Sequence, residues 1–187
     1  MRLFIAVNFS KEVKQQILEV QDRIKDVVKQ GKFSSPENLH LTLVFLGETP
    51  AERLPEIKNA MNQVAFSDRK PASAFYLAFS NAGFFKRGGK ELWWLGIDEK
   101  NCNEEKQLKA LQSSLAAELT SRGFHIDRRP FTAHITLGRE IKNGPWPFKT
   151  EKIPVNVKRI SLMLSEHMRN PDKKNKLIYT ELFGCDL

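Results

Sequence analysis

Two of the four histidines occur in the same local sequence. His40 lies in NLHLTLVFLG and is followed two residues later by Thr42; His134 lies in FTAHITLGR and is followed two residues later by Thr136. Both segments are short apolar runs of the kind that form strands. Because residues two apart on a strand point to the same face, each run presents an imidazole beside a hydroxyl.

The opposite faces of the two runs are apolar. We expect this face to carry Leu41, Leu43 and Phe45 in the first run, and Ile135 and Leu137 in the second. An apolar face can pack into the core and leave the polar face to a cleft. Two such strands facing each other would bring two histidines and two threonines together.

A pair of imidazoles beside hydroxyls suits the cleavage of a phosphodiester. A neutral imidazole can take a proton from the attacking oxygen, and a protonated one can give a proton to the leaving oxygen. Histidine serves both purposes because its ordinary pKa is about 6.5. Threonine hydroxyls can donate hydrogen bonds to the phosphate oxygens on which charge builds up. Neither histidine lies in an H-x-x-x-H or H-E-x-x-H motif. The pattern therefore predicts a reaction that needs no metal and no cofactor.

The other two histidines lack a threonine partner. His125 lies in GFHIDRR and His167 in SEHMRN, at positions that read as loops or strand ends. We expect both to be solvated or structural.

The charge of the chain favours an anionic ligand. Its 187 residues carry a net charge of +8, with 41% hydrophobic and 28% charged residues, as in an ordinary globular protein with basic character. Apolar runs do not approach the roughly 20 residues that a membrane span needs, and the first one, Leu3 to Val7, is too short for a signal peptide. Cys102 and Cys185 form no C-x-x-C pair. These features predict a cytoplasmic protein with reduced thiols that does not bind a membrane.

The order of apolar patterns predicts two similar halves. In the first half we expect strands at 3–7 and 40–46, a helix from Ser10 to Gln30 between them, a helix beginning near Pro55 and a strand at 74–80. A glycine-rich connection, 81–90, would follow.

The second half repeats the order of strand, helix and histidine-bearing strand. We expect strands at 92–97 and 131–139 around a helix that contains Leu108 and Leu119, then a Pro/Gly loop over 141–152 and two strands, about 153–164 and 177–183. The late strands without helices argue against a parallel doubly wound sheet. We predict an α+β fold and one domain over 1–187. Its two lobes, with antiparallel sheets and flanking helices, would span roughly 1–85 and 86–187 and could interleave, and each would contribute one His-x-Thr strand to a central cleft.

The doubled motif resembles the 2H phosphoesterase superfamily, and most closely its RNA 2′,3′-cyclic phosphodiesterases, also described as 2′-5′ RNA ligases. MRLFIAV, NLHLTLVFLGE, LWWLGI and RPFTAHITLGR occur in the family's order and spacing, so that the resemblance covers nearly the whole chain. It departs at Ala133, where the family has proline, and in a longer basic segment between Ser165 and Tyr179, two residues in family-like places.

The resemblance implies hydrolysis of a 2′,3′-cyclic phosphate, on an RNA end or a small cyclic nucleotide, to a 2′-phosphate. His40 would be the proton donor and His134 the proton acceptor, although the sequence leaves open which histidine plays which role. Thr42 and Thr136 would hold the phosphate. Arg139 matches an arginine of the family's second motif. A regular strand would point it away from the cleft, unless a bulge at Gly138 redirects it.

Further residues are candidates for binding the substrate. Arg129 is a candidate contact to the RNA backbone, and the aromatic residues that could stack on a base are Phe4, Phe9, Phe84, Phe85, Trp93 and Trp94. We expect a monomer. Two alternatives stay open: a module that binds a nucleotide or RNA end without turnover, and the joining of RNA ends through a 2′-5′ linkage by the reverse reaction.

Overall fold

The computed structural model describes residues 1–66, 72–98, 102–127, 129–145, 147–170 and 173–187. Its helices are α1 (Lys11–Lys25), α2 (Leu54–Ala65) and α3 (Cys102–Ser121), with two short 3-10 turns, η1 (Pro36–Asn38) and η2 (Ala51–Arg53). Its strands are β1 (Arg2–Asn8), β2 (Lys32–Phe33), β3 (His40–Glu48), β4 (Phe75–Arg87), β5 (Lys90–Ile97), β6 (His134–Ile141), β7 (Phe148–Val157), β8 (Arg159–Asn170) and β9 (Lys173–Asp186).

The strands form one sheet in which the spatial order differs from the order along the chain. The strand order is β7-β4-β5-β6-β3-β1-β8-β9, and β2 pairs with β6 in addition. The strand pairs of the described residues are antiparallel. The two histidine-bearing strands, β3 and β6, lie side by side at the middle of this path and share a single backbone pair, Leu41 with Ile135. The sheet therefore consists of two four-stranded halves that meet at the two His-x-Thr motifs.

These halves are not consecutive in the sequence. The half that contains β3 is completed by β8 and β9 from the end of the chain, and the half that contains β6 includes β4 from the first part of the chain. The expected α+β fold is confirmed. Strand β4 runs across position 85/86, where the sequence predicted the boundary between the lobes.

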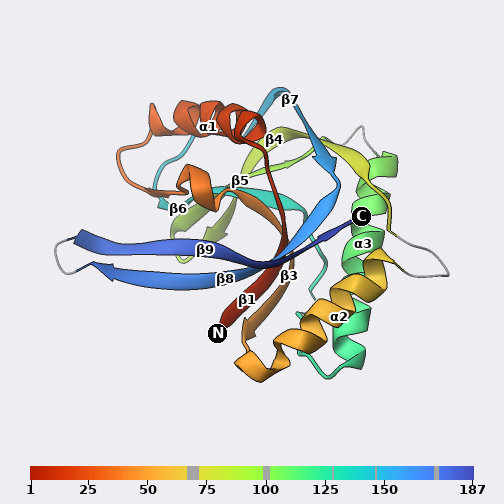
Figure 1. The fold of residues 1–187 in the computed structure, drawn as a ribbon. Helices are drawn as coiled ribbons and strands as arrows, with labels where there is room; N and C mark the ends of the chain where they lie inside the picture. The colour runs from red at the N-terminus through yellow and green to blue at the C-terminus, as the bar shows by residue number, and fades with distance from the viewer. Residues whose placement is uncertain (67–71, 99–101, 128, 146, 171–172) are drawn as a thin grey trace.

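The helices cover one face of the sheet (Figure 1). Helix α1 packs against β6 and β7, while α2 and α3 pack against each other and against β9, β4 and β3. One apolar core joins the helices to the inner face of the motif strands, through Ile17, Leu41, Leu111, Ile135 and Leu137 among others. The histidines lie on the opposite face, where a small second cluster contains Phe4, Ala6 and Met163.

Several predicted boundaries were wrong. Ser10 caps α1 by accepting a hydrogen bond from the Val13 amide, as its sequence suggests, but the helix ends at Lys25 instead of Gln30. The reason is that Val27, which fits the helical spacing, is 59% exposed and has no core to face. No helix in the described ranges is long and apolar enough to cross a membrane.

The segment predicted as a glycine-rich connection is mostly strand. Strand β4 continues to Arg87, and the turn is confined to Gly88 and Gly89, both with positive φ. Gly83 belongs in the strand because the indole of Trp94 packs where its side chain would be; a Cβ there would lie 2.8 Å from the ring. This close approach explains the glycine better than a loop does.

Three further strand predictions need correction. The strand expected at 153–164 is two strands, β7 and β8, which separate at Lys158, and β7 takes in part of the expected Pro/Gly loop. Strand β9 is longer than 177–183 because it pairs with β8 over nearly its whole length. Strand β6 begins at His134 rather than at Phe131.

Candidate active site

The two motif strands have the same shape. From the histidine onward, both alternate between partly exposed and buried residues over four positions, and then both break the alternation. The break is a bulge at the third residue after each histidine. Leu43 is the extra residue of β3 against β1, and Leu137 is the extra residue of β6 against β5. A bulge reverses which face the following residues occupy.

The bulges change the position of the fifth residue after each histidine. In β6 this residue is Arg139, which is brought to the cleft face, as expected if a bulge lay near Gly138. In β3 it is Phe45, which we expected in the core. It is instead 46% exposed and lies at the cleft. The second bulge was missed because β3 has Val44 where β6 has a glycine.

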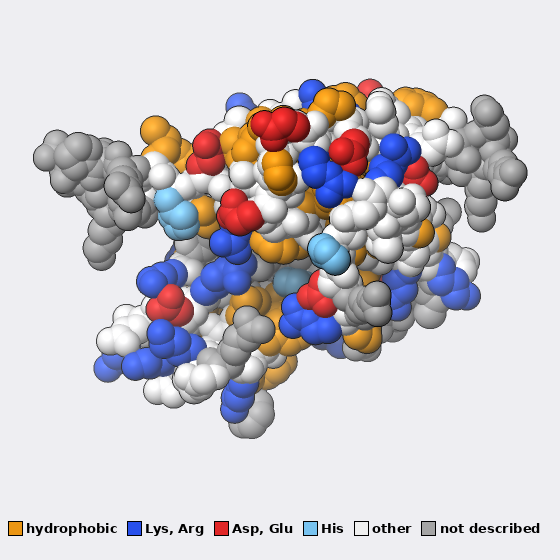
Figure 2. All heavy atoms as spheres, turned by 90° about the horizontal axis from the view of Figure 1, so that it is seen from below, with side chains coloured by type: hydrophobic (Ala, Val, Ile, Leu, Met, Phe, Trp, Pro, Cys, Tyr) orange, Lys and Arg blue, Asp and Glu red, His pale blue; other side chains and the backbone are white. Residues whose placement is uncertain are grey.

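Both histidines line one cavity of about 280 Å³ that crosses the β3–β6 junction. The same cavity is lined by both threonines and by residues of β1, β8 and β9: Arg2, Phe4, His40, Thr42, Phe45, His134, Thr136, Arg139, Ser165, His167, Leu177 and Tyr179. These described lining residues include two arginines and no carboxylate. The predicted convergence of the two motifs is thus present in the structure. Figure 2 shows histidine side chains around a hollow on this face, with Lys and Arg side chains gathered beside it.

His40 is held from several sides. Its Nδ1 donates to the carbonyl of Asn38 at 2.7 Å, which leaves Nε2 unprotonated, and Nε2 accepts from the hydroxyl of Thr42 at 2.9 Å. The rings of Phe4 and Tyr179 flank the imidazole at centroid distances of 4.8 and 5.1 Å. Burial lowers the pKa of His40 to about 4, with smaller contributions from the charges of Arg139 and His134.

His134 is anchored in the same way. Its Nδ1 donates to the carbonyl of Thr132 at 2.8 Å, so Nε2 is the nitrogen left for chemistry. The ring of Phe85 stands edge-on to it at 5.6 Å. Burial lowers the pKa of His134, and the charge of Arg139 lowers it further, against the opposite effect of the Thr132 hydrogen bond. Both shifts favour the neutral imidazole.

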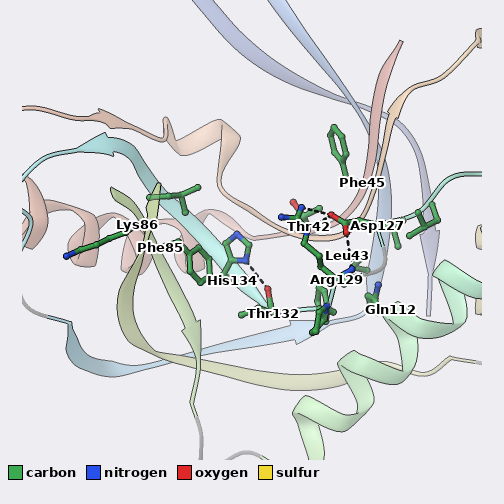
Figure 3. Close-up of a pocket in the computed structure, with 15 residues that line it drawn as sticks. Thr42, Leu43, Phe45, Phe85, Lys86, Gln112, Asp127, Arg129, Thr132 and His134 are labelled. Carbon is green, nitrogen blue, oxygen red and sulfur yellow. Dashed lines mark hydrogen bonds and ion pairs between the residues drawn. The ribbon is translucent and has the colours of Figure 1, made fainter. Parts of the chain in front are cut away.

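Arg129 lies in a different place. It borders a neighbouring cavity of about 490 Å³, which shares Thr42, Phe45 and His134 with the first but extends toward α3 and the segment before β6 (Figure 3). Its guanidinium folds back onto the carboxylate of Asp127, and this arginine holds the pKa of the carboxyl down at about 2. The structure does not bring Arg129 to the His–Thr cavity.

The six candidate aromatic residues divide into two groups. Phe4 contacts His40, and Phe85 contacts His134 at the wall of the larger cavity. The other four are placed elsewhere: Phe9 packs on Phe79, Phe84 on the fully buried Trp93, and Trp94 beneath Phe85. Those four support the sheet and line neither cavity.

Part of the cavity wall comes from residues that the sequence motifs did not indicate. His167 was expected to be solvated or structural; it is exposed but lines the cavity together with Ser165 of the same strand and Arg2 of β1. Strand alternation would have grouped Ser165 with His167, but only the pairing of β1 with β8 brings them to the site. His125 is exposed and lines neither cavity. In the described ranges, no three His, Cys, Asp or Glu side chains are grouped so as to hold a metal ion.

Comparisons with known proteins agree with this geometry. The model of the LigT-like phosphoesterase family matches residues 7–92 and 101–171. An RNA 2′,3′-cyclic phosphodiesterase of Thermotoga maritima is 34% identical over 82% of this chain and 75% of its own, and one of Archaeoglobus fulgidus is 32% identical over 78% and 76%.

Solved structures show the same fold. The LigT protein of Escherichia coli complexed with 3′-AMP superposes with a TM-score of 0.79 at 26% identity, covering 100% of this chain and 97% of that one. The TT0787 protein of Thermus thermophilus gives the same score and identity, covering 100% and 98%. The family match spans most of the chain and includes both His-x-Thr strands, which confirms the predicted resemblance. The chain belongs to the LigT-like phosphoesterases of the 2H superfamily.

Proposed function

We propose that this protein hydrolyses a 2′,3′-cyclic phosphate at the end of an RNA chain to a 2′-phosphate. The observation that carries the proposal is the pair of imidazoles, each with Nε2 left free by a backbone hydrogen bond, in one cavity with Arg139 and without a carboxylate among its described lining residues. The names of the relatives, RNA 2′,3′-cyclic phosphodiesterases from several bacteria and archaea, support the same substrate.

The reaction needs one proton acceptor and one proton donor. His134 takes a proton from water through Nε2 while the water oxygen bonds to phosphorus. The bond from phosphorus to the ribose 3′ oxygen breaks, and His40 gives that oxygen a proton. The product carries a 2′-phosphate and a 3′-hydroxyl. Since burial lowers the pKa of His40 to about 4, the negative charge of the bound substrate must raise this pKa before His40 can act as a donor.

The remaining polar groups stabilise the transition state. The hydroxyl of Thr42 donates to His40 in the empty cavity, and it can turn to a phosphate oxygen when substrate enters. Thr136 and Arg139 approach the same space from β6. An arginine aimed at developing phosphate charge is among the strongest single contributions to such a reaction.

The larger cavity suits the terminal base. Phe45 and Phe85 border it and are 46% and 41% exposed, so each offers a ring for stacking. Gln112 on α3 adds an amide that can bond to a base edge. Arg129 then lies at the rim of this cavity, where its guanidinium can leave Asp127 and bind a phosphate of the RNA.

The test is product analysis on a short RNA with a 2′,3′-cyclic phosphate end, in excess EDTA. We expect a 2′-phosphate, because His40 protonates the 3′ oxygen, and no loss of activity with EDTA, because the proposed groups are all side chains of the protein. A 3′-phosphate product would reverse the assigned polarity. Saturable binding without product would instead indicate a binding module, and a 2′-5′-linked product with added 5′-hydroxyl RNA would indicate end joining.

A further inference from the structure

Three hydrogen-bond donors of the His–Thr cavity have no part in the chemistry described above. They are Arg2 on β1 and Ser165 and His167 on β8. Arg2 is directly opposite Ser165 in the pairing of β1 with β8, and His167 follows Ser165 by two residues, on the same face of the strand. The three side chains therefore form one row along the wall of the cavity.

The β8–β9 hairpin, which carries Ser165 and His167, is fixed to the segment just before β3. The side-chain amide of Asn38 donates to the carbonyl of Leu177 at 2.8 Å, and Lys176 pairs with Glu37 at 2.5 Å. Asn38 also anchors His40, and Leu177 is the backbone partner of His167. One short segment thus holds both the catalytic imidazole and the wall that contains His167.

The donors of this row are available to a ligand. Within the described part of the chain, Ser165 and His167 make no side-chain hydrogen bond and Arg2 makes no ion pair; the guanidinium of Arg2 lies over the ring of Phe45, 5.2 Å from its centroid. A guanidinium, a hydroxyl and an imidazole favour an anion. The carboxylate of Glu48, the β3 neighbour of Arg2, pairs with the amino group of Met1 and does not line the cavity.

The backbone of this row lies on the other side of β3 from Arg139. The sheet order is β6-β3-β1-β8, and neighbouring strands are about 4.8 Å apart. Arg139 on β6 is therefore separated by about two strand spacings from Arg2 and about three from Ser165 and His167. In the proposed reaction the phosphate lies between the two motif histidines on β3 and β6, so the row on β1 and β8 is placed for a second one.

We propose that Arg2, Ser165 and His167 bind the phosphate on the 5′ side of the terminal nucleotide, and that the preferred substrate is an oligonucleotide rather than a cyclic mononucleoside phosphate. The inference rests on the proposed function for the position of the first phosphate. The base is attached to the ribose at C1′, and the 5′ carbon, which carries the 5′ oxygen, is attached at C4′, on the other side of the ring oxygen. With the base in the larger cavity beside His134, the 5′ side points across β3 toward β1 and β8.

Binding measurements test the subsite without requiring turnover. Calorimetric titration compares adenosine 2′-monophosphate with adenosine 2′,5′-bisphosphate, which differ only in the second phosphate. We expect the bisphosphate to bind about tenfold more tightly at low salt. The advantage should shrink as salt is added, because it depends on charge. Equal affinities for the two ligands would overturn the proposal.

Variants then assign the advantage to the row. His167→Ala and Arg2→Met should each reduce the ratio of the two affinities several-fold, and His167→Gln, which keeps a donor, should retain part of it. His125→Ala is the matched control, an exposed histidine outside both cavities that should leave the ratio unchanged. An unchanged ratio in both row variants would place the second phosphate elsewhere and refute the assignment.

The outcome is separable from that of the proposed function. Hydrolysis of cyclic phosphates with equal binding of the two adenosine ligands would overturn the subsite and leave the reaction standing. A binding advantage that the row variants abolish, in a protein that produces no 2′-phosphate, would support the subsite and overturn the reaction.

Discussion

Strands β3 and β6 hold the two histidines in the same way, but they surround them differently. Each histidine bonds to the carbonyl two residues before it, and each strand has a bulge three residues after it. The bulge brings Phe45 to the cleft on β3 and Arg139 on β6. The shared backbone explains why two imidazoles converge, and the difference at one position places a charged side chain on β6 where β3 has an aromatic one.

This asymmetry matters because the reaction itself is asymmetric. One imidazole must begin without a proton and the other must acquire one. Two identical surroundings would give the two histidines similar pKa values and no preferred direction. Arg139 lies on the β6 side, and the more enclosed His40, between Phe4 and Tyr179, meets a different environment from His134.

The largest expected effect is the loss of either imidazole. His40→Ala and His134→Ala should each reduce kcat on a cyclic-phosphate substrate by a factor of about 10² to 10⁴, the usual value of general acid or base catalysis. Steady-state assays on purified variants, with circular dichroism as a check of folding, measure this. His125→Ala should keep full activity. Full activity in either motif variant would contradict the paired mechanism.

The next largest effect is expected from substitutions of Arg139 and Phe45, each five residues after a motif histidine. Arg139→Met should reduce kcat/KM by about 10²-fold, because it removes a positive charge from the developing phosphate charge. Phe45→Leu, at the equivalent position of β3, should reduce kcat/KM less than tenfold and mainly by raising KM, since stacking contributes to binding. Equal losses, or a larger one for Phe45, would show that the charged and aromatic sides are wrongly assigned.

The pH profile sharpens the comparison further. The proposed base, His134, becomes protonated and inactive as the pH falls below its pKa. The proposed acid, His40, loses its proton and becomes inactive as the pH rises above its pKa. The pH dependence of kcat/KM reports the pKa values of the free enzyme. The pKa of His40 is about 4, and the pKa of His134 is lowered from 6.5. The maximum of kcat/KM should therefore lie between about pH 4 and pH 6.5. Outside this window kcat/KM should fall about tenfold per pH unit.

Arg139→Met provides the control for the pH profile. The charge of Arg139 lowers the pKa of both histidines, so removing this charge should move the whole pH profile of kcat/KM to higher pH. A maximum above pH 7 that Arg139→Met does not move would mean that these two imidazoles do not set the profile.

The smallest effect concerns the bulges. A Cβ at Gly138 would lie 2.9 Å from Cδ1 of Ile141 and 3.1 Å from Cδ1 of Phe33. Gly138→Ala should therefore lower the free energy of unfolding by about 1–3 kcal/mol, as overpacking does. Adding Ile141→Val removes the nearer atom and should recover part of the loss. Denaturant unfolding of the single and double variants measures the coupling, and strictly additive losses would contradict the steric explanation.

Local sequence patterns predicted the histidines and threonines well. Alternation along a strand is a local rule, so it placed His40 with Thr42 and His134 with Thr136, and the glycine in β6 pointed to the bulge that redirects Arg139. The exposure of Phe45 was not predicted in this way. The bulge of β3 is followed by Val44, a residue that is common in regular strands, where β6 has Gly138. The sequence has no local sign of that irregularity.

The rest of the site depends on contacts distant in the chain. Arg2, Ser165 and His167 meet only because β1 pairs with β8, more than 150 residues later. In the same way, β4 is separated from β1 and β3, which precede it in the chain, and pairs with β5 and β7. The pseudo-repeat therefore predicted the elements but not their division between the halves of the sheet. The pseudo-repeat describes the order along the chain, and register and pairing decide the neighbours in space.

The backbone hydrogen bonds of the two imidazoles have a consequence for evolution and for engineering. In many enzymes a carboxylate side chain selects the tautomer of a catalytic histidine, and one substitution of that carboxylate removes the selection. Here the carbonyls of Asn38 and Thr132 do so, and a carbonyl belongs to every residue type. The tautomers are therefore inherited with the path of the chain, and side-chain substitutions that preserve that path should leave them intact while the walls of the cavity diversify.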